Sequence, residues 1–252
     1  MNESNSDNTE VENTLPPVEP PVPEVHHRDV SGGTARAAVF GVSDGLVSNI
    51  GLILGVAGAG TAPSVVRLAG IAGLIAGGIS MAAGEYNSMK VQKELYQYEI
   101  EMERIELIRN PHVELVELAQ IYESRGLNAD QARELAAAMM EYPELALETH
   151  AREELGIDPN GLGSPIGAAG YSLVAFSIGA VAPLMPWFVT SGDGAIASSV
   201  LVAFVAAIVV GVAIARSTAR HWVRTVVRQV LFTLIPAAIT YMIGSLVGVQ
   251  GV

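Results

Sequence analysis

Five long apolar runs constrain this chain more than any other feature of its sequence. A helix that crosses a bilayer needs about 20 mainly apolar residues. Only 16% of the 252 residues are charged, against roughly 25% in soluble domains, so there are too few polar residues to cover five buried helices. We therefore predict an all-α, polytopic membrane protein. Its five expected transmembrane helices are Ala37–Gly60, Leu68–Met89, Pro165–Thr190, Ala195–Ala215 and Val226–Val249.

The basic residues predict how these helices are oriented. Lys and Arg accumulate in the cytoplasmic loops of membrane proteins. Thirteen of the fourteen basic residues lie before the first run, between the second and third, or around the gap between the fourth and fifth; Arg67 is the exception. We expect the N-terminus in the cytoplasm and the C-terminus on the opposite side. A bacterial plasma membrane is the expected location, or a vacuolar membrane if the organism is eukaryotic.

Composition divides the chain into four parts. Residues 1–30 are rich in Pro and Glu, and they contain too few large apolar residues to offset the entropy of ordering, so we predict a disordered acidic tail. Residues 31–90 hold the first two spans, and residues 161–252 hold the last three. Residues 91–160 carry sixteen acidic side chains against six basic ones, with apolar positions at helical spacing. This part is predicted to be a cytoplasmic helical domain that binds metal.

Turn residues subdivide this acidic insert. Breaks are expected at Asn110-Pro111, at residues 126–128 and at Tyr142-Pro143. Asn128 is a suitable N-cap for a helix over Ala129–Tyr142, and Gly156 a suitable stop for the next helix. No helix-breaking signal lies between residues 68 and 109, so we expect the second span to continue as one long helix into the insert.

An aspartate lies within the first apolar run. Asp44 stands in the sequence Gly41-Val-Ser-Asp-Gly-Leu and is followed by Ser48 and Asn49. A charged side chain at membrane depth costs at least ~2.5–3.5 kcal/mol, and such residues usually face a pathway or a partner. Ser48 lies four residues on and shares the Asp44 face of the helix. The alternative is that Asp44 lies at the membrane edge and only caps the helix.

The second run carries a matching stripe of residues. Met81, Glu85 and Met89 recur every four residues and share one helical face. A thioether beside a carboxylate suits a borderline metal ion such as Fe(II). Methionine stripes are also common in ordinary helix packing, which is the alternative here.

The acidic insert supplies a second set of candidate ligands. They fall in three helical segments, and carboxylate and imidazole groups suit Fe(II) and Mn(II). An exposed acidic face with no ligand is the alternative, because most runs of charge are solvated. The candidates are Glu103 and Glu106, Glu114 and Glu117, and then His150, Glu153 and Glu154.

Several function classes are excluded or disfavoured by the sequence. A chain of net charge −12 is a poor nucleic-acid binder, since phosphate contacts need clustered Lys and Arg. A chain without cysteine has no thiolate zinc site and no iron–sulfur cluster. No phosphate-binding loop, H-E-x-x-H motif or G-x-S-x-G elbow occurs. We therefore expect no enzyme activity, with a membrane ferroxidase as the remaining enzymatic alternative.

Three motifs give the chain a resemblance to a known family. They are Gly41-Val-Ser-Asp-Gly-Leu, the glycine-rich segment from Gly70 to Met81-Ala-Ala-Gly-Glu-Tyr, and Glu153-Glu-Leu-Gly at the end of the acidic insert. Together with the five spans and the position of the insert, they resemble the vacuolar iron transporter family over residues 28–250. The sequences of these motifs resemble those of bacterial members more than those of plant members.

This resemblance implies a function and a set of residues. It implies a homodimer, formed through the first transmembrane helices, that exports Fe(II) and Mn(II) from the cytoplasm in exchange for protons. Co(II) and Zn(II) are further candidate substrates, and no tightly bound cofactor is expected. The residues matching the family's translocation path are Asp44 and Met81, and those matching its metal-binding domain are Glu103, Glu106, Glu114, Glu117 and Glu154.

The chain departs from the family pattern at two places. His150 stands where the family has methionine, and Gly73 stands where plant members have glutamate. Glu85, three turns further along, is a candidate substitute for the missing carboxylate. A metal-gated channel and a membrane metal sensor that transports nothing remain the alternative functions.

Overall fold

The computed structural model describes residues 34–218 and 220–250, which contain helices and no strand. The predicted tail, residues 1–30, lies outside these described residues. The all-α fold predicted from the sequence is confirmed. The helices are α1 (Thr34–Gly58), α2 (Pro63–Arg109), α3 (Pro111–Ser124), α4 (Ala129–Met139), α5 (Pro143–Glu153), α6 (Pro165–Leu184), the 3-10 helix η1 (Met185–Phe188), α7 (Asp193–Thr218) and α8 (Trp222–Gln250).

Five of these helical segments are long and apolar enough to cross a membrane, as predicted. They are α1, α2, α6 together with η1, α7 and α8. In a bilayer no water can satisfy the backbone amides, so each crossing segment has to satisfy its own hydrogen bonds as a helix. The structure therefore has five candidate membrane spans, at the positions where the apolar runs placed them.

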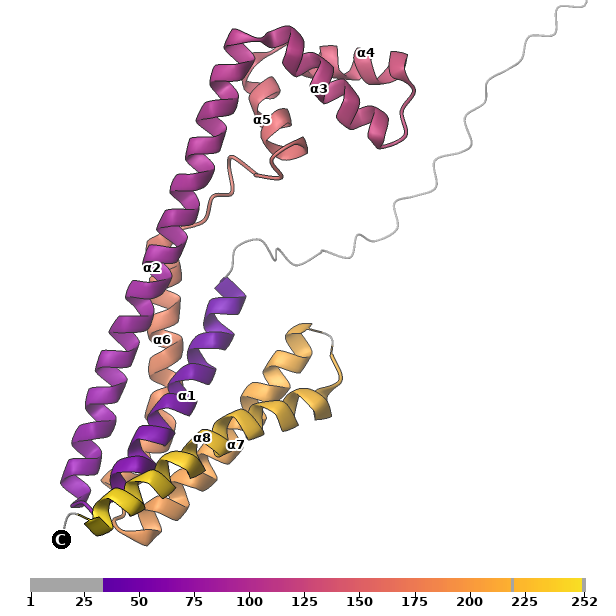
Figure 1. Cartoon of the computed structure of the whole chain (residues 1–252). Coiled ribbons are helices and arrows are strands. Elements are labelled where there is room, and N and C mark those ends of the chain that lie inside the picture. The colour runs from indigo at the N-terminus through magenta and orange to yellow at the C-terminus, as the bar shows by residue number, and fades with distance from the viewer. Residues whose placement is uncertain (1–33, 219, 251–252) are drawn as a thin grey trace, which may run out of the picture.

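Helix α2 dominates the shape of the molecule (Figure 1). It runs for 47 residues without interruption, about 70 Å at 1.5 Å per residue. Pro63 stands at its first position, where a missing N–H costs nothing, and Asn110 ends it just before Pro111. The predicted continuation of the second span is confirmed. One end of α2 packs in the helical bundle, and the other end carries α3, α4 and α5.

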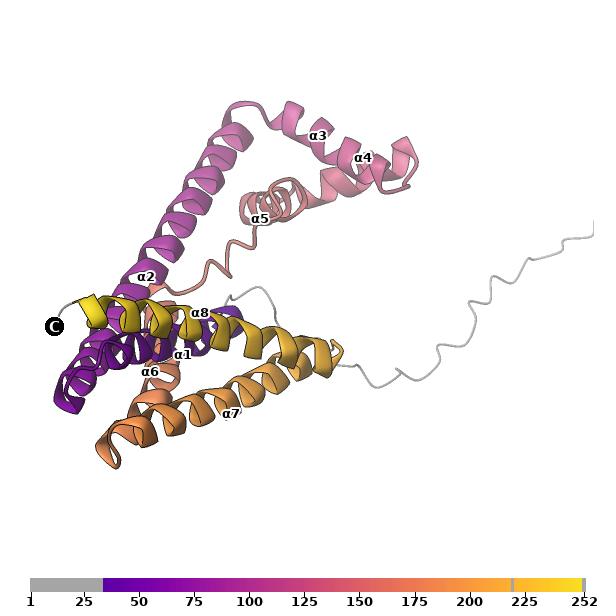
Figure 2. The ribbon, with the colours of Figure 1, turned by 60° about the horizontal axis from the view of Figure 1, so that its bottom comes forward.

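Helix α1 is the centre of the bundle and contacts α2, α6, α7 and α8 (Figure 2). Its buried face presents Leu46, Ile50 and Leu54 to the small residues Ala203 and Ala207 of α7. The buried residues of α7 recur every four positions and are all small. This stripe lets α7 approach closely. Close packing of backbones drives helix association where lipid removes the hydrophobic effect.

Glycines set the distance between α1 and α6. A Cβ atom added to Gly45 would collide with the backbone carbonyl of Phe176, and one added to Gly179 would collide with the carbonyl of Val42. The two backbones are therefore in direct contact at this crossing. Gly41 and Gly45 of α1 permit this close approach of α6.

The helices α3, α4 and α5 form a small separate core. Its centre is made of Leu118, Ala119 and Tyr122 of α3 against Ala132 and Ala136 of α4. Asn128 caps α4 through a reciprocal pair of hydrogen bonds with Gln131, as expected for this N-cap residue. Helix α4 ends at Met139, three residues before the predicted end. Gly156, with φ of +66°, follows α5 in the left-handed conformation that terminates helices.

The crossing of α1 and α6 generates a stability prediction. Gly179→Ala should lower the free energy of unfolding by about 1–3 kcal/mol, because the new methyl group overlaps the Val42 backbone, which cannot move aside cheaply. Gly170→Ala in the same helix meets no atom within 4 Å and is the matched control. It should be neutral or stabilising by up to about 1 kcal/mol. Thermal unfolding of both variants in detergent measures the difference; equal stabilities would contradict the close crossing.

Candidate functional site

A cavity of about 430 Å³ opens between α1 and α2, with Phe176 of α6 at its wall. All five residues predicted for a membrane pathway line this cavity: Asp44, Ser48 and Asn49 from α1, and Met81 and Glu85 from α2. Met89, the third member of the predicted stripe, lies instead beside Gly163. Two carboxylates, a hydroxyl, an amide and a thioether thus line one partly open cavity.

The side chains from α1 are held in different ways. The Ser48 hydroxyl donates a 2.6 Å hydrogen bond to the backbone carbonyl of Asp44. Asn49 is almost completely buried, and its Nδ2 donates a 2.6 Å hydrogen bond to the backbone carbonyl of Ala180. Asp44 is half-buried, which places a carboxylate within the apolar length of α1 rather than at its end. This position does not favour the alternative in which Asp44 only caps the helix.

Further residues of α2 complete the cavity wall, and of these the sequence singles out only Gly73. They are Gly73, Gly77, Ser80 and Gly84, which share one face of the helix with Met81. Their spacing of four, three and four residues is the helical repeat, so it could have indicated a common face. Gly73 and Glu85 are twelve residues apart, about 18 Å along the helix, so they line different ends of the cavity.

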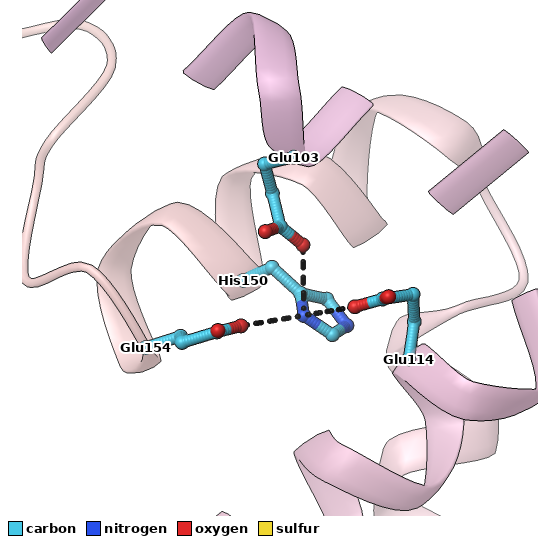
Figure 3. A network of polar contacts seen from close by, with 4 residues as sticks. All are labelled: Glu103, Glu114, His150 and Glu154. Atoms are coloured by element: carbon cyan, nitrogen blue, oxygen red, sulfur yellow. Dashed lines mark hydrogen bonds and ion pairs between the residues drawn. The ribbon is translucent and has the colours of Figure 1, made fainter. Parts of the chain in front are cut away.

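A second cluster lies where α3 and α5 meet the far end of α2 (Figure 3). Glu103 comes from α2, Glu114 from α3, His150 from α5 and Glu154 from the residue after α5. One ligand atom from each of these residues lies within 4.8 Å of all the others. Among the described residues it is the one group of at least three such side chains found with this spacing.

The imidazole of His150 is the centre of this cluster. Its Nδ1 lies 3.1 Å from Oε1 of Glu103, 3.5 Å from Oε2 of Glu154 and 3.8 Å from Oε2 of Glu114. His150 is fully buried, and Glu103 and Glu114 are each 4% exposed. The Nε2 atom of His150 has no hydrogen-bond partner. Buried carboxylates at this density repel one another unless protons or a cation neutralise them.

The pKa values reflect this crowding. Burial, followed by the charges of Glu103 and Glu117, raises the pKa of Glu114 to about 7. Burial also raises the pKa of Glu154, with a further contribution from Glu103. Burial alone would lower the pKa of His150, but its hydrogen bond to Glu103 and the neighbouring negative charges outweigh burial and raise it. The cluster therefore retains protons near neutral pH when no cation is bound.

Three of the predicted ligands in the insert lie outside this cluster. Glu106 and Glu117 are exposed, although their negative charges still contribute to the raised pKa of Glu114. Glu153 forms an ion pair with Arg125. The structure thus brings together Glu103, Glu114, His150 and Glu154 from the predicted set of seven.

Both sites have donor sets suited to divalent cations. Carboxylate oxygens and a neutral imidazole nitrogen bind first-row divalent metals, and a thioether adds a softer donor in the membrane cavity. The fold and these two acidic sites define a class: a multi-pass, all-α membrane protein with acidic side chains both inside its bundle and beyond it.

Comparisons with known proteins identify the family. The model of the VIT family matches residues 35–245, which include four of the candidate spans, most of the fifth and the second cluster. The chain therefore belongs to the VIT family.

Named relatives agree with this assignment. Vacuolar iron transporter 1 of Oryza sativa subsp. japonica is 33% identical over 190 residues, covering 75% of each chain. Vacuolar iron transporter 1 of Arabidopsis thaliana is 30% identical over 184 residues, covering 71% of this chain and 74% of the relative. The vacuolar iron transporter of Acanthamoeba castellanii is 37% identical over 161 residues, covering 63% and 58%.

The raised pKa values generate a prediction for the metal-free protein. A carboxyl group whose pKa is higher in the folded than in the unfolded state stabilises the fold at low pH and loses this effect as pH rises through the folded value. For Glu114 the window runs from 4.5 to about 7. His150 and Glu154 shift in the same direction, so thermal stability should fall as the pH rises through this window.

The Glu114→Gln variant tests which group is responsible. It should flatten the decline of the unfolding temperature with pH in chelator-treated protein, because glutamine is neutral throughout. Glu99→Gln, which changes an exposed residue of α2 in the same way, should leave the decline unchanged. An equal pH dependence in all three proteins would contradict the assignment of the pKa shift to the buried cluster.

Proposed function

We propose that this VIT-family chain is a transporter that moves Fe(II) and Mn(II) out of the cytoplasm in exchange for protons. Its relatives bear the name vacuolar iron transporter, which supports a membrane protein that transports iron. The direction of transport, the coupling to protons and the use of Mn(II) belong to the proposal. The plasma-membrane location predicted for a bacterial member stays a prediction, since the relatives' names refer to the vacuole.

One observation supports this proposal most strongly. Asp44, Met81 and Glu85 line one cavity between two helices that are each able to span a membrane. An ionisable residue inside a span is costly and usually marks an ion pathway. The second cluster, attached through the same helix α2, supplies a place where cations collect before they enter the cavity.

The proposed mechanism is competition between metal ions and protons for the same side chains. In the second cluster the raised pKa values of Glu114 and His150 mean that an arriving divalent cation displaces protons. The ion then moves along α2 to the cavity, where Asp44 binds it. Protons arriving from the opposite side release it. This scheme needs no nucleotide, which agrees with the lack of a phosphate-binding loop in the sequence.

Orientation and assembly complete the proposal. The distribution of Lys and Arg supports an orientation with the second cluster in the cytoplasm and the C-terminus on the other side. The homodimer expected through the first transmembrane helices would use the outer surface of α1. An apolar groove of about 410 Å³ runs there between α1 and α8, where Gly55 and Gly244 already bring the two helices of this chain into close contact. Small residues at a helix surface favour close association of a second helix.

The transport proposal is tested by uptake into proteoliposomes. The full chain should accumulate Mn(II), or Fe(II) kept reduced, when the vesicle interior is acidic. Asp44→Asn should lower this uptake at least about tenfold, because it removes the charged ligand of the cavity. Asp193→Asn, at the exposed start of α7, is the matched control and should transport normally.

Other outcomes of this assay identify the alternative functions. Uptake that does not need a proton gradient would favour a channel. Metal binding without any uptake would favour the sensor. Oxygen consumption on adding Fe(II) would favour the ferroxidase. Normal gradient-driven uptake by Asp44→Asn would refute the proposed pathway.

The second cluster generates a separate binding prediction. His150→Ala and Glu103→Gln should each weaken Mn(II) binding to the full chain by about tenfold or more, because each removes a ligand atom from a shared site. Glu99→Gln changes an exposed side chain of α2 one turn from Glu103 and should bind as the unmodified chain does. Equilibrium dialysis or electron paramagnetic resonance measures the bound ion. Unchanged binding in both cluster variants would contradict the site.

A further inference from the structure

The amide group of Asn49 is held in one orientation at the wall of the membrane cavity. Its Nδ2 donates the 2.6 Å hydrogen bond to the backbone carbonyl of Ala180. A carbonyl only accepts, so the amide nitrogen has to face α6 and the amide oxygen has to point elsewhere. The side chain is 1% exposed, so water does not compete for this arrangement.

The amide oxygen points toward α2 at Gly73. A Cβ atom added to Gly73 would lie 2.9 Å from Oδ1 of Asn49, within contact distance. Oδ1 itself is buried and has no hydrogen-bond donor. Gly73 and Asn49 both belong to the cavity wall that also carries Asp44 and Met81. A fixed acceptor without a donor therefore lies against Gly73 of α2, beside the end of the Leu52 side chain.

A buried acceptor with no donor is unfavourable unless something else binds it. A divalent cation satisfies this requirement, because amide carbonyl oxygens are good ligands for hard and borderline cations. A carbonyl also binds without adding a second negative charge inside the membrane, where each charge is costly. Glu85 lies about 18 Å further along α2, so it is not a ligand at the same level.

We propose that Asn49 is a metal ligand of the membrane cavity, giving its amide oxygen to the ion at the level of Gly73, and that the lack of a side chain at Gly73 lets the ion reach this oxygen once the end of Leu52 moves aside. The inference rests on the proposed transport function and deepens it. The end of the Leu52 side chain also reaches Gly73, at 2.5 Å from the added Cβ position. Leu52 is 39% exposed, so its flexible end moves aside when an ion enters.

Two alanine substitutions distinguish the effect of covering the Asn49 oxygen from the effect of filling part of the cavity. Gly73→Ala places a methyl group against Oδ1 of Asn49 while leaving the bond to Ala180 intact. Gly84→Ala changes another glycine of the same helix and the same cavity, but its methyl group meets no atom within 4 Å. Asn49→Leu removes the oxygen and keeps a side chain of similar size.

The experiment measures the initial rate of Mn(II) uptake against Mn(II) concentration in proteoliposomes that contain the full chain. Gly73→Ala and Asn49→Leu should each raise the KM at least about tenfold, because a ligand is covered or lost. Gly84→Ala should raise the KM clearly less than Gly73→Ala does, because its methyl group covers no ligand. Thermal unfolding of each purified variant shows whether it is folded. If Asn49→Leu is not folded, the KM of Gly73→Ala decides the test.

The outcomes distinguish this inference from the proposed function. If the unmodified chain transports and Asp44→Asn does not, while Gly73→Ala and Asn49→Leu keep a normal KM, the role of Asn49 is refuted and transport stands. If Gly84→Ala is impaired as strongly as Gly73→Ala, the effect belongs to cavity volume and the role of Asn49 is refuted. If the unmodified chain moves no Mn(II), the proposed function fails, and the inference fails with it.

Discussion

The unbroken helix α2 is the constraint on which the rest of the structure depends. A backbone that crosses a bilayer has to satisfy its own hydrogen bonds, and α2 continues the same pattern of bonds to Arg109. It presents Met81 and Glu85 to the membrane cavity and Glu103 to the second cluster. Because a helix is stiff, the two candidate sites are held at a fixed separation.

The two sites handle buried negative charge in different ways. In the second cluster, three carboxylates surround one imidazole, and the pKa of Glu114 rises to about 7. In the membrane cavity, Asp44 is accompanied by neutral donors, the amide of Asn49 and the thioether of Met81. A crowded acidic cluster outside the bundle can collect cations and exchange them for protons. A cavity with fewer charges avoids the larger cost of burying several carboxylates in the membrane.

Much of this arrangement could be predicted from the sequence, since its causes are local. Apolar runs gave the five spans, and the lack of a breaker before Asn110 gave the length of α2. Other features depend on packing between distant segments. Glu153 and Glu154 are neighbours in sequence, yet Glu153 pairs with Arg125 while Glu154 joins the cluster. The orientation of the Asn49 amide depends on Ala180, 131 residues away, which no periodicity in α1 reveals.

The most direct measurement of the central claim, that α2 connects two cation sites, is anomalous diffraction from crystals of the full chain grown with Mn(II). We predict one anomalous peak beside His150, within the group that includes Glu103 and Glu114, and a second peak in the cavity beside Asp44. Peaks confined to exposed carboxylates such as Glu99, with neither of these two positions occupied, would contradict the claim.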